Sequence, residues 1–229
     1  MRKTLGAATA LLAMFAVWGS AMAAPKVAPP KKASVAAAVR PPSSTVNALV
    51  KWAQGTGDNH DLPFIIIDKQ AAQVFVYDAD GKMLGSAPAL LGLAIGDDST
   101  PGVGDRELSD IAPKDRTTPA GRFQAAFGPG PGKEKVFWVD YGTAISLHPV
   151  ITTNPKEHRP QRLRSATVAD NRITFGCINV PPAFYRQVVA KTFADSRGIV
   201  YILPEVQTLA QVFPMFQLQL ATSEAVQPH

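Results

Sequence analysis

Short runs of β-branched and aromatic residues, separated by turn-forming residues, occupy the chain from residue 62 onward. Residues 64–68 and 74–77 form the first two runs, and Asp80-Gly81 supplies a two-residue turn into a third. Further runs cover 136–139, 144–147 and 198–203. Runs of this length, bounded by Gly, Pro, Asp and Asn, are typical of strands. The sequence therefore predicts a mainly β fold, with its core domain over residues 62–205.

Helical periodicity is confined to short segments. Tyr185, Val189 and Phe193 recur every four residues after Pro182, which predicts a helix there. Within a lead-in segment, 45–61, we expect a short helix capped by Ser43 or Ser44 and ended by Gly55. The tail, 206–229, has one candidate helix around 209–218.

The N-terminus has the pattern of an export signal. Two basic residues precede an apolar run over 5–18 and the small-residue segment Ala21-Met22-Ala23. The run is shorter than the ~20 residues of a membrane span, so we expect cleavage after residue 23 and no stable span afterwards. Residues 24–44, rich in Ala, Pro and Lys, read as a linker. These segments predict a protein in the periplasm or elsewhere in the cell envelope.

The basic charge of the chain is concentrated in its N-terminal part. The net charge is +5, from 23 basic and 18 acidic residues, and six of the basic ones lie in residues 1–44 without an acid. The remainder is therefore close to neutral, which argues against nucleic acid as a partner. A basic exported tail suits anionic wall polymer or lipid headgroups better, or it is simply solvated.

Cys177 is the only cysteine of the chain. In an oxidising compartment an unpaired cysteine is a reactive thiol or a partner in an intermolecular disulfide, and otherwise a small buried hydrophobe. Gly176 before it permits close backbone approach to a ligand. A helix beginning at Pro182 would turn its positive end toward the sulfur and favour the thiolate.

A thiol with an ordinary pKa near 8.5 needs a base or cation beside it to react at neutral pH. Of the four histidines, His148 is the best candidate because it ends the strand predicted at 144–147. The segment between His148 and Cys177 is richer in Arg and Lys than in acids, so Arg172 and Arg164 are candidates for binding a substrate carboxylate. A solvated surface loop is the alternative.

No cofactor or metal is expected. Asp78-Ala79-Asp80-Gly81 lacks the later ligands of a calcium loop, and Gly102-Val103-Gly104 has no third glycine in step and no helix pattern after it.

Several of these stretches together resemble the L,D-transpeptidases of bacterial cell walls. The resemblance runs from about residue 64 to 202. It is carried by the first strand pair, by Thr118-Pro119-Ala120-Gly121-Arg122-Phe123, by Leu147-His148, and by Thr174-Phe175-Gly176-Cys177-Ile178-Asn179. It implies a β-sandwich with a few short helices, one of them following the loop of the catalytic cysteine.

The resemblance also implies roles for individual residues. Cys177 would be the nucleophile and His148 its base, with the carbonyl of Pro149 orienting the ring. The backbone N–H groups of Gly176 and Cys177 would form the oxyanion hole. Thr174 and Asn179 would hold the loop beside the substrate. The family usually has Gly at the position of Pro149, often His at that of Phe175, and a shorter interval between histidine and cysteine.

The activity that the resemblance implies is acyl transfer in cell-wall biogenesis, with consequences for cell shape and with carbapenems as inhibitors. Cys177 would form a thioester with a peptidoglycan stem peptide and pass it to an amine, on a second stem or on a wall-attached protein. With water as acceptor the protein would be an L,D-carboxypeptidase or a cross-link hydrolase. A catalytically inactive wall-binding protein, suggested by Phe175 and the long loop, is the other alternative. A sortase-like enzyme would require a membrane anchor and a threonine-rich motif before the cysteine, and neither is evident in the sequence.

Overall fold

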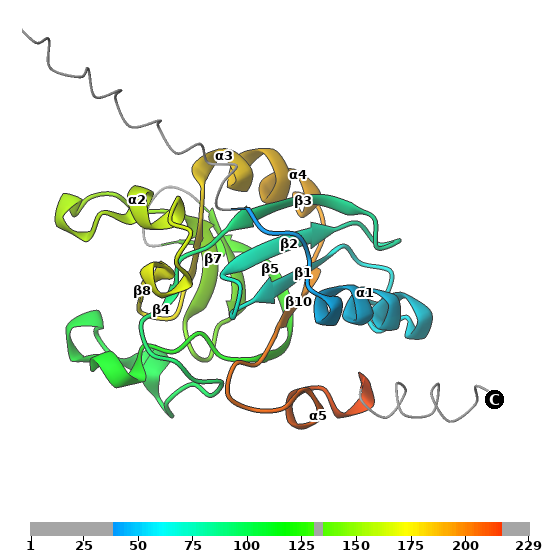
Figure 1. Ribbon diagram of the computed structural model, residues 1–229, viewed down its shortest axis with the longest axis horizontal. Helices are drawn as coiled ribbons and strands as arrows, with labels where there is room; N and C mark the ends of the chain where they lie inside the picture. Colours follow the sequence, from blue (N-terminus) through cyan, green and yellow to red (C-terminus); the bar gives the residue numbers. More distant parts are fainter. Residues whose placement is uncertain (1–38, 131–134, 217–229) are drawn as a thin grey trace, which may run out of the picture. The chain divides into compact units, whose positions relative to one another are not determined.

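The computed structural model describes residues 39–130 and 135–216 (Figure 1). The predicted signal segment, most of the predicted linker and the end of the tail lie outside these residues. The described residues form ten strands: β1 Phe64–Asp68, β2 Gln73–Tyr77, β3 Met83–Pro88, β4 Leu91–Gly92, β5 Gly121–Pro129, β6 Lys135–Asp140, β7 Ile145–Pro149, β8 Arg172–Thr174, β9 Ile178–Val180 and β10 Gly198–Ile202. No helix among the described residues is long and apolar enough to cross a membrane.

Eight of the strands form one sheet in the order β3-β2-β1-β10-β5-β6-β7-β9, and β4 and β8 form a separate pair. The pairs β1/β10 and β7/β9 are parallel and the others in the large sheet are antiparallel. Just after β3, Leu90 exchanges two backbone hydrogen bonds with Asn179 of β9, of 2.8 and 2.9 Å. The two ends of the sheet therefore meet. The predicted mainly β fold is confirmed, and the sandwich is one curled, nearly closed sheet.

The strands β1, β2 and β10 are buried on both faces. Along β1, Ile65 and Ile67 point into the core enclosed by the sheet, whereas Phe64 and Ile66 pack on the other side. Side chains alternate between faces along a strand, so a continuous apolar run predicts this double burial.

The outer face of these strands is covered by the segments on either side of the domain. Helix α1, Ser44–Thr56, contributes Leu49 and Trp52, and the tail contributes Phe213 and Phe216, which is 1% exposed. The Trp52 and Phe216 rings meet edge to face at 5.5 Å. Helix α1 and the described part of the tail therefore share one apolar core with these strands.

The ends of α1 follow the capping rules with one difference from expectation. The Ser43 hydroxyl accepts a hydrogen bond from the Val46 N–H, as predicted. The helix passes through Gly55 and ends at Gly57, which takes the left-handed conformation with φ of 68°. Gly57 therefore terminates the helix in place of Gly55.

The remaining helices are short. They are α2 Arg159–Leu163, α3 Pro182–Phe184, a π-helical turn Tyr185–Val189, α4 Ala190–Thr192 and α5 Leu209–Val212, with 3-10 turns at Val103–Asp105, Leu108–Asp110, Pro113–Asp115, Pro155–Glu157 and Val168–Asn171. The predicted helix after Pro182 is thus the continuous segment from α3 through the π turn to α4. It buries Tyr185, Val189 and Phe193 against the core, as their spacing predicts.

Candidate active site

The parallel pairing of β7 with β9 gathers the polar residues of the site. His148 lies opposite Asn179 in register, and Leu147 lies opposite Ile178. Alternate residues share a face, so Ser146 joins His148 on one side and Cys177 joins Asn179 there. Leu147 and Ile178 point the other way and are fully buried in the core. Two short polar–apolar alternations, brought into register, thus build one polar face at the end of the sheet.

His148 is held through both ring nitrogens. Its Nδ1 lies 2.8 Å from the carbonyl oxygen of Pro149, and its Nε2 lies 3.0 Å from Nδ2 of Asn179. A carbonyl only accepts, so Nδ1 carries the proton. The carbonyl of Pro149 therefore accepts from the ring, and a proline in this position is compatible with that contact.

The Cys177 sulfur is half-buried on the same face. It lies 3.6 Å from the Ser146 hydroxyl and 3.6 Å from the Ala144 carbonyl oxygen. Burial alone would raise the pKa of the Cys177 thiol, but hydrogen bonding and positive charge from His148, with further hydrogen bonds from Ser146, outweigh it and lower the pKa below its usual value. The thiolate is therefore favoured by its neighbours on the sheet.

The helix after Cys177 does not contribute to this effect in the way the sequence suggested. Strand β9 separates the cysteine from Pro182 at the start of α3. Three strand residues advance the chain by roughly 10 Å, beyond the range in which the end of a helix acts on a charge. The expectation of a helix end near the sulfur is wrong, and β7 supplies the stabilising groups instead.

The loop that carries Cys177 is fastened by two threonines. The Thr174 hydroxyl donates to the Cys177 carbonyl oxygen at 2.7 Å and accepts from the Gly176 N–H at 3.1 Å. The Thr118 hydroxyl donates to the Gly176 carbonyl oxygen at 2.7 Å and accepts from the Gly92 N–H at 2.8 Å. Thr174 thus has the loop-holding position predicted for it. The Gly176 N–H, predicted for the oxyanion hole, is already used inside the loop.

Gly176 has a conformation that other residues rarely adopt. Its φ is +130°, and a Cβ there would lie 2.7 Å from the Thr117 carbonyl oxygen and 2.6 Å from Cδ1 of Ile145. We expect Gly176→Ala to lower the free energy of unfolding by about 1–3 kcal/mol and to displace the sulfur, slowing its alkylation. Denaturant unfolding and iodoacetamide kinetics measure both effects.

Gly55→Ala is the matched control for this substitution. A Cβ at Gly55 meets nothing within 4 Å, and the residue lies inside α1. Alanine there should stabilise the helix by about 0.5–1 kcal/mol and leave the thiol rate unchanged. An equal response of the two variants would contradict the assigned role of Gly176.

A cavity of about 570 Å³ opens onto the polar face. Its lining includes His148, Cys177 and Asn179, and otherwise it is mostly apolar: Leu108, Val136, Trp138, Val150, Ile151 and Phe175. This volume suits a small peptide segment. Leu108 belongs to the long segment between β4 and β5, so that loop contributes to the wall of the cavity.

Phe175 lines the cavity together with Cys177 and His148, and its ring contacts a cation. The Arg116 guanidinium carbon lies 4.0 Å from the centroid of the Phe175 ring, a cation–π contact. Arg116 also donates from Nε to the Ile111 carbonyl oxygen at 3.0 Å. Phe175 thereby links the long loop to the loop of the cysteine.

The two arginines predicted to bind substrate do not line the cavity. Arg172 pairs with Glu205 through both terminal nitrogens and donates to the Lys69 carbonyl oxygen. Its side chain is 10% exposed. Arg164 ends α2 and lies outside the cavity lining. Two cations among the described residues line the cavity, Lys135 and Arg159, and no local pattern in the sequence distinguishes Arg159 from the other basic residues of its loop.

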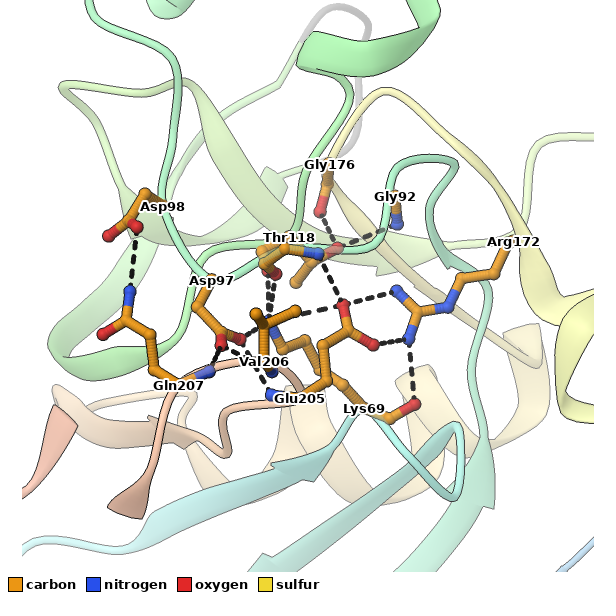
Figure 2. A network of polar contacts seen from close by, with 11 residues as sticks. Lys69, Gly92, Asp97, Asp98, Thr118, Arg172, Gly176, Glu205, Val206 and Gln207 are labelled. Atoms are coloured by element: carbon orange, nitrogen blue, oxygen red, sulfur yellow. Dashed lines mark hydrogen bonds and ion pairs between the residues drawn. The ribbon is translucent and has the colours of Figure 1, made fainter. Parts of the chain in front are cut away.

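Figure 2 shows the buried ionic cluster to which Arg172 belongs. Lys69, with a fully buried side chain, donates to Asp97 at 2.6 Å and lies 3.6 Å from Glu205. It also donates to the carbonyl oxygen of Thr118 at 2.9 Å, and Thr118 in turn holds Gly176. The cluster therefore connects the ends of β1 and β10 to the loop that carries the cysteine.

Fold and site together define a mainly β domain with a cysteine–histidine pair at the mouth of a cavity, an arrangement capable of nucleophilic acyl transfer. No family model matches the chain. No curated protein matches it either.

Among solved structures, the chain is similar to L,D-transpeptidases. With the enzyme from Mycobacterium smegmatis the identity is 17% and the TM-score 0.36, over 62% of this chain and 58% of that one. With the catalytic domain of the Enterococcus faecium enzyme they are 17% and 0.37, over 62% and 98%. With the helical cell shape determining protein Pgp2 of Campylobacter jejuni they are 18% and 0.42, over 64% and 49%. This chain thus spans little more than half of the M. smegmatis chain, and the likeness is one of fold alone.

Proposed function

We propose that this protein is a peptidoglycan L,D-transpeptidase of the cell envelope, with Cys177 as the nucleophile. The observation that supports this best is the register of β7 and β9, which puts the thiol, His148 and Ser146 on one face. The lowered pKa of Cys177, caused by these neighbours against the effect of burial, supports it further.

The first stage forms a thioester. The Cys177 sulfur attacks a peptide carbonyl carbon of the donor stem, and Nε2 of His148 takes the thiol proton because Nδ1 is already protonated toward Pro149. His148 then protonates the leaving amine as the peptide C–N bond breaks. The Gly176 N–H already donates to Thr174, so the Cys177 N–H is the group that would donate to the oxyanion.

The second stage transfers the acyl group. An amine of a second stem, or of a wall-attached protein, attacks the thioester carbonyl while His148 accepts the amine's proton. The sulfur leaves as thiolate, which its lowered pKa favours. The product is a new amide, and no cofactor takes part in the scheme.

The deciding experiment uses the exported chain with a disaccharide tetrapeptide as substrate. We expect cross-linked dimers by mass spectrometry, and a carbapenem should add covalently to the wild type and not to Cys177→Ala. Shortened monomers without dimers would indicate a carboxypeptidase, and cleavage of supplied dimers a cross-link hydrolase. A folded wild type that gains no carbapenem mass and converts no muropeptide would support a wall-binding protein and refute the enzyme.

A further inference from the structure

A chain of hydrogen bonds runs from the cavity wall to the candidate base. Arg159 donates from Nη1 to Oδ1 of Asn179 at 2.7 Å, and Nδ2 of Asn179 lies 3.0 Å from Nε2 of His148. His148 continues the chain to the Pro149 carbonyl at 2.8 Å. Each member therefore contacts the next within hydrogen-bonding distance.

The direction of this chain is set by its two ends. A guanidinium has only donors, so the Asn179 atom facing Arg159 must be the amide oxygen. The amide nitrogen then faces His148 and donates, so Nε2 must present its lone pair. The Pro149 carbonyl, which only accepts, requires the proton on Nδ1. Both ends select the same neutral tautomer.

Asn179 and Arg159 are both largely buried, so water competes little with the hydrogen bonds that select the tautomer. Asn179 is 1% exposed, so an amide that turned over would find little water to replace its contacts with Arg159 and His148. The Arg159 side chain is 12% exposed and is steadied by an ion pair between its Nε and Glu157. Arg159 is the first residue of α2 and follows His158, which takes the left-handed conformation.

We propose that Arg159 is a positioning residue that fixes His148 as the Nδ1-protonated tautomer by holding the amide of Asn179. This inference rests on the proposed function for its catalytic consequence: Nε2, the nitrogen that would take the thiol proton, carries no proton of its own. The thiol proton can reach Nε2 only if the Asn179 N–H yields its place, so Arg159 also governs how readily the pair becomes charged. Among the described residues that line the cavity, the charged or titratable groups besides His148 are Cys177, Lys135 and Arg159, and Arg159 is paired with Glu157.

The tautomer can be observed directly by NMR of protein labelled with ¹⁵N-histidine. The spectrum of His148→Gln identifies the signals of His148 among the four histidines. At a pH where the ring is neutral we expect a protonated Nδ1 and a bare Nε2 in the wild type, the reverse of the tautomer that free histidine prefers in water. Because this reading needs no substrate, it is independent of whether the muropeptide assay succeeds.

Three variants test the role of the amide. Asn179→Asp presents an acceptor to Nε2, so both ring nitrogens should be protonated and acylation should fall by about a hundredfold or more because the base is lost. Arg159→Leu frees the amide to turn, so the His148 signals should become a mixture of forms, with roughly a tenfold lower kcat and little change in KM. Arg159→Lys keeps a donor toward Oδ1 and should retain the wild-type tautomer.

Arg164→Leu is the matched control, since it removes the same charge from the end of the same helix outside the cavity. It should leave both the tautomer and the rate unchanged. A wild-type His148 protonated on Nε2 would overturn the proposal, as would a tautomer indifferent to Arg159→Leu. If Arg159→Leu fails to fold, the wild-type and Asn179→Asp spectra still decide the question.

Discussion

Replacing His148 with glutamine should leave the fold intact and slow acylation of Cys177 by about 10²–10⁴-fold at neutral pH. Glutamine has a similar reach and can keep polar contacts with Asn179, but it cannot take a proton. The residue is half-buried at the cavity, so its removal opens no void in the core. Mass spectrometry of carbapenem adduct formation over time measures the effect.

The pH dependence of Cys177 alkylation is a second measurement that tests His148→Gln. In the wild type the pKa of Cys177 is lowered, so thiolate persists, and iodoacetamide reacts, at pH values below the ordinary thiol pKa of about 8.5. Without His148 the effect of burial dominates and the pKa rises, so the profile should move to higher pH. Ser146→Ala, which removes a smaller contribution, should move it less. Superimposable profiles for wild type and His148→Gln would contradict the pairing of imidazole and thiol.

Asp97→Asn should lower the free energy of unfolding by about 3–5 kcal/mol, because it removes the nearer anion of the buried Lys69 ammonium and leaves only Glu205, which Arg172 also pairs. The side chains of this pair are 0% and 1% exposed. The Asp97 carboxylate also accepts the backbone N–H groups of Glu205, Val206 and Gln207, at 2.9, 2.8 and 2.6 Å. Asparagine offers one acceptor oxygen where the carboxylate offers two, so part of this set is lost as well. Denaturant unfolding monitored by tryptophan fluorescence measures the change.

The same residue predicts an acid-sensitive fold. Burial would raise the pKa of Asp97, but Lys69 and the three backbone N–H groups outweigh it and lower the pKa. A carboxyl group with a depressed folded-state pKa stabilises the fold fully above its unfolded pKa of about 3.9, and this contribution disappears as the pH falls through the folded-state pKa. Asp97→Asn should therefore remove part of the acid dependence of stability.

Two controls isolate the buried pair. Asp98→Asn changes the neighbouring carboxylate, which is exposed and accepts a hydrogen bond from the Gln207 amide, so its effect should stay within about 0.5 kcal/mol (Figure 2). The double change Lys69→Met with Asp97→Asn removes both charges while keeping an acceptor for the backbone N–H groups, and it should cost less than Asp97→Asn alone. A single variant as stable as the wild type would show that the pair does not hold the fold. Because Thr118 joins this cluster to Gly176, alkylation of Cys177 in Asp97→Asn also reports how far the disturbance travels.

Local patterns in the sequence predict most of the strands and helices, and they single out Cys177 and His148 as candidates. Short apolar runs form strands wherever the backbone is bounded by turn residues, and the spacing of Tyr185, Val189 and Phe193 places one helical face on the core. Cys177 and His148 stood out because local features distinguish them: a single thiol after a glycine, and a histidine at the end of a predicted strand. These signals depend only on near neighbours in the chain, so they can be recognised without knowing the fold.

The partners of the charged residues, by contrast, depend on contacts between parts of the chain that are distant in sequence. Arg159, Arg164 and Arg172 belong to one basic stretch, yet the first reaches Asn179 across the cavity wall and the third is buried against Glu205, 33 residues away. The engagement of the Gly176 N–H by Thr174, and the contact of Arg116 with Phe175, likewise follow from the folding of loops. Long flexible side chains have many possible partners, and burial selects among them by the register of strands that are distant in the chain. Sequence periodicity carries no record of that selection.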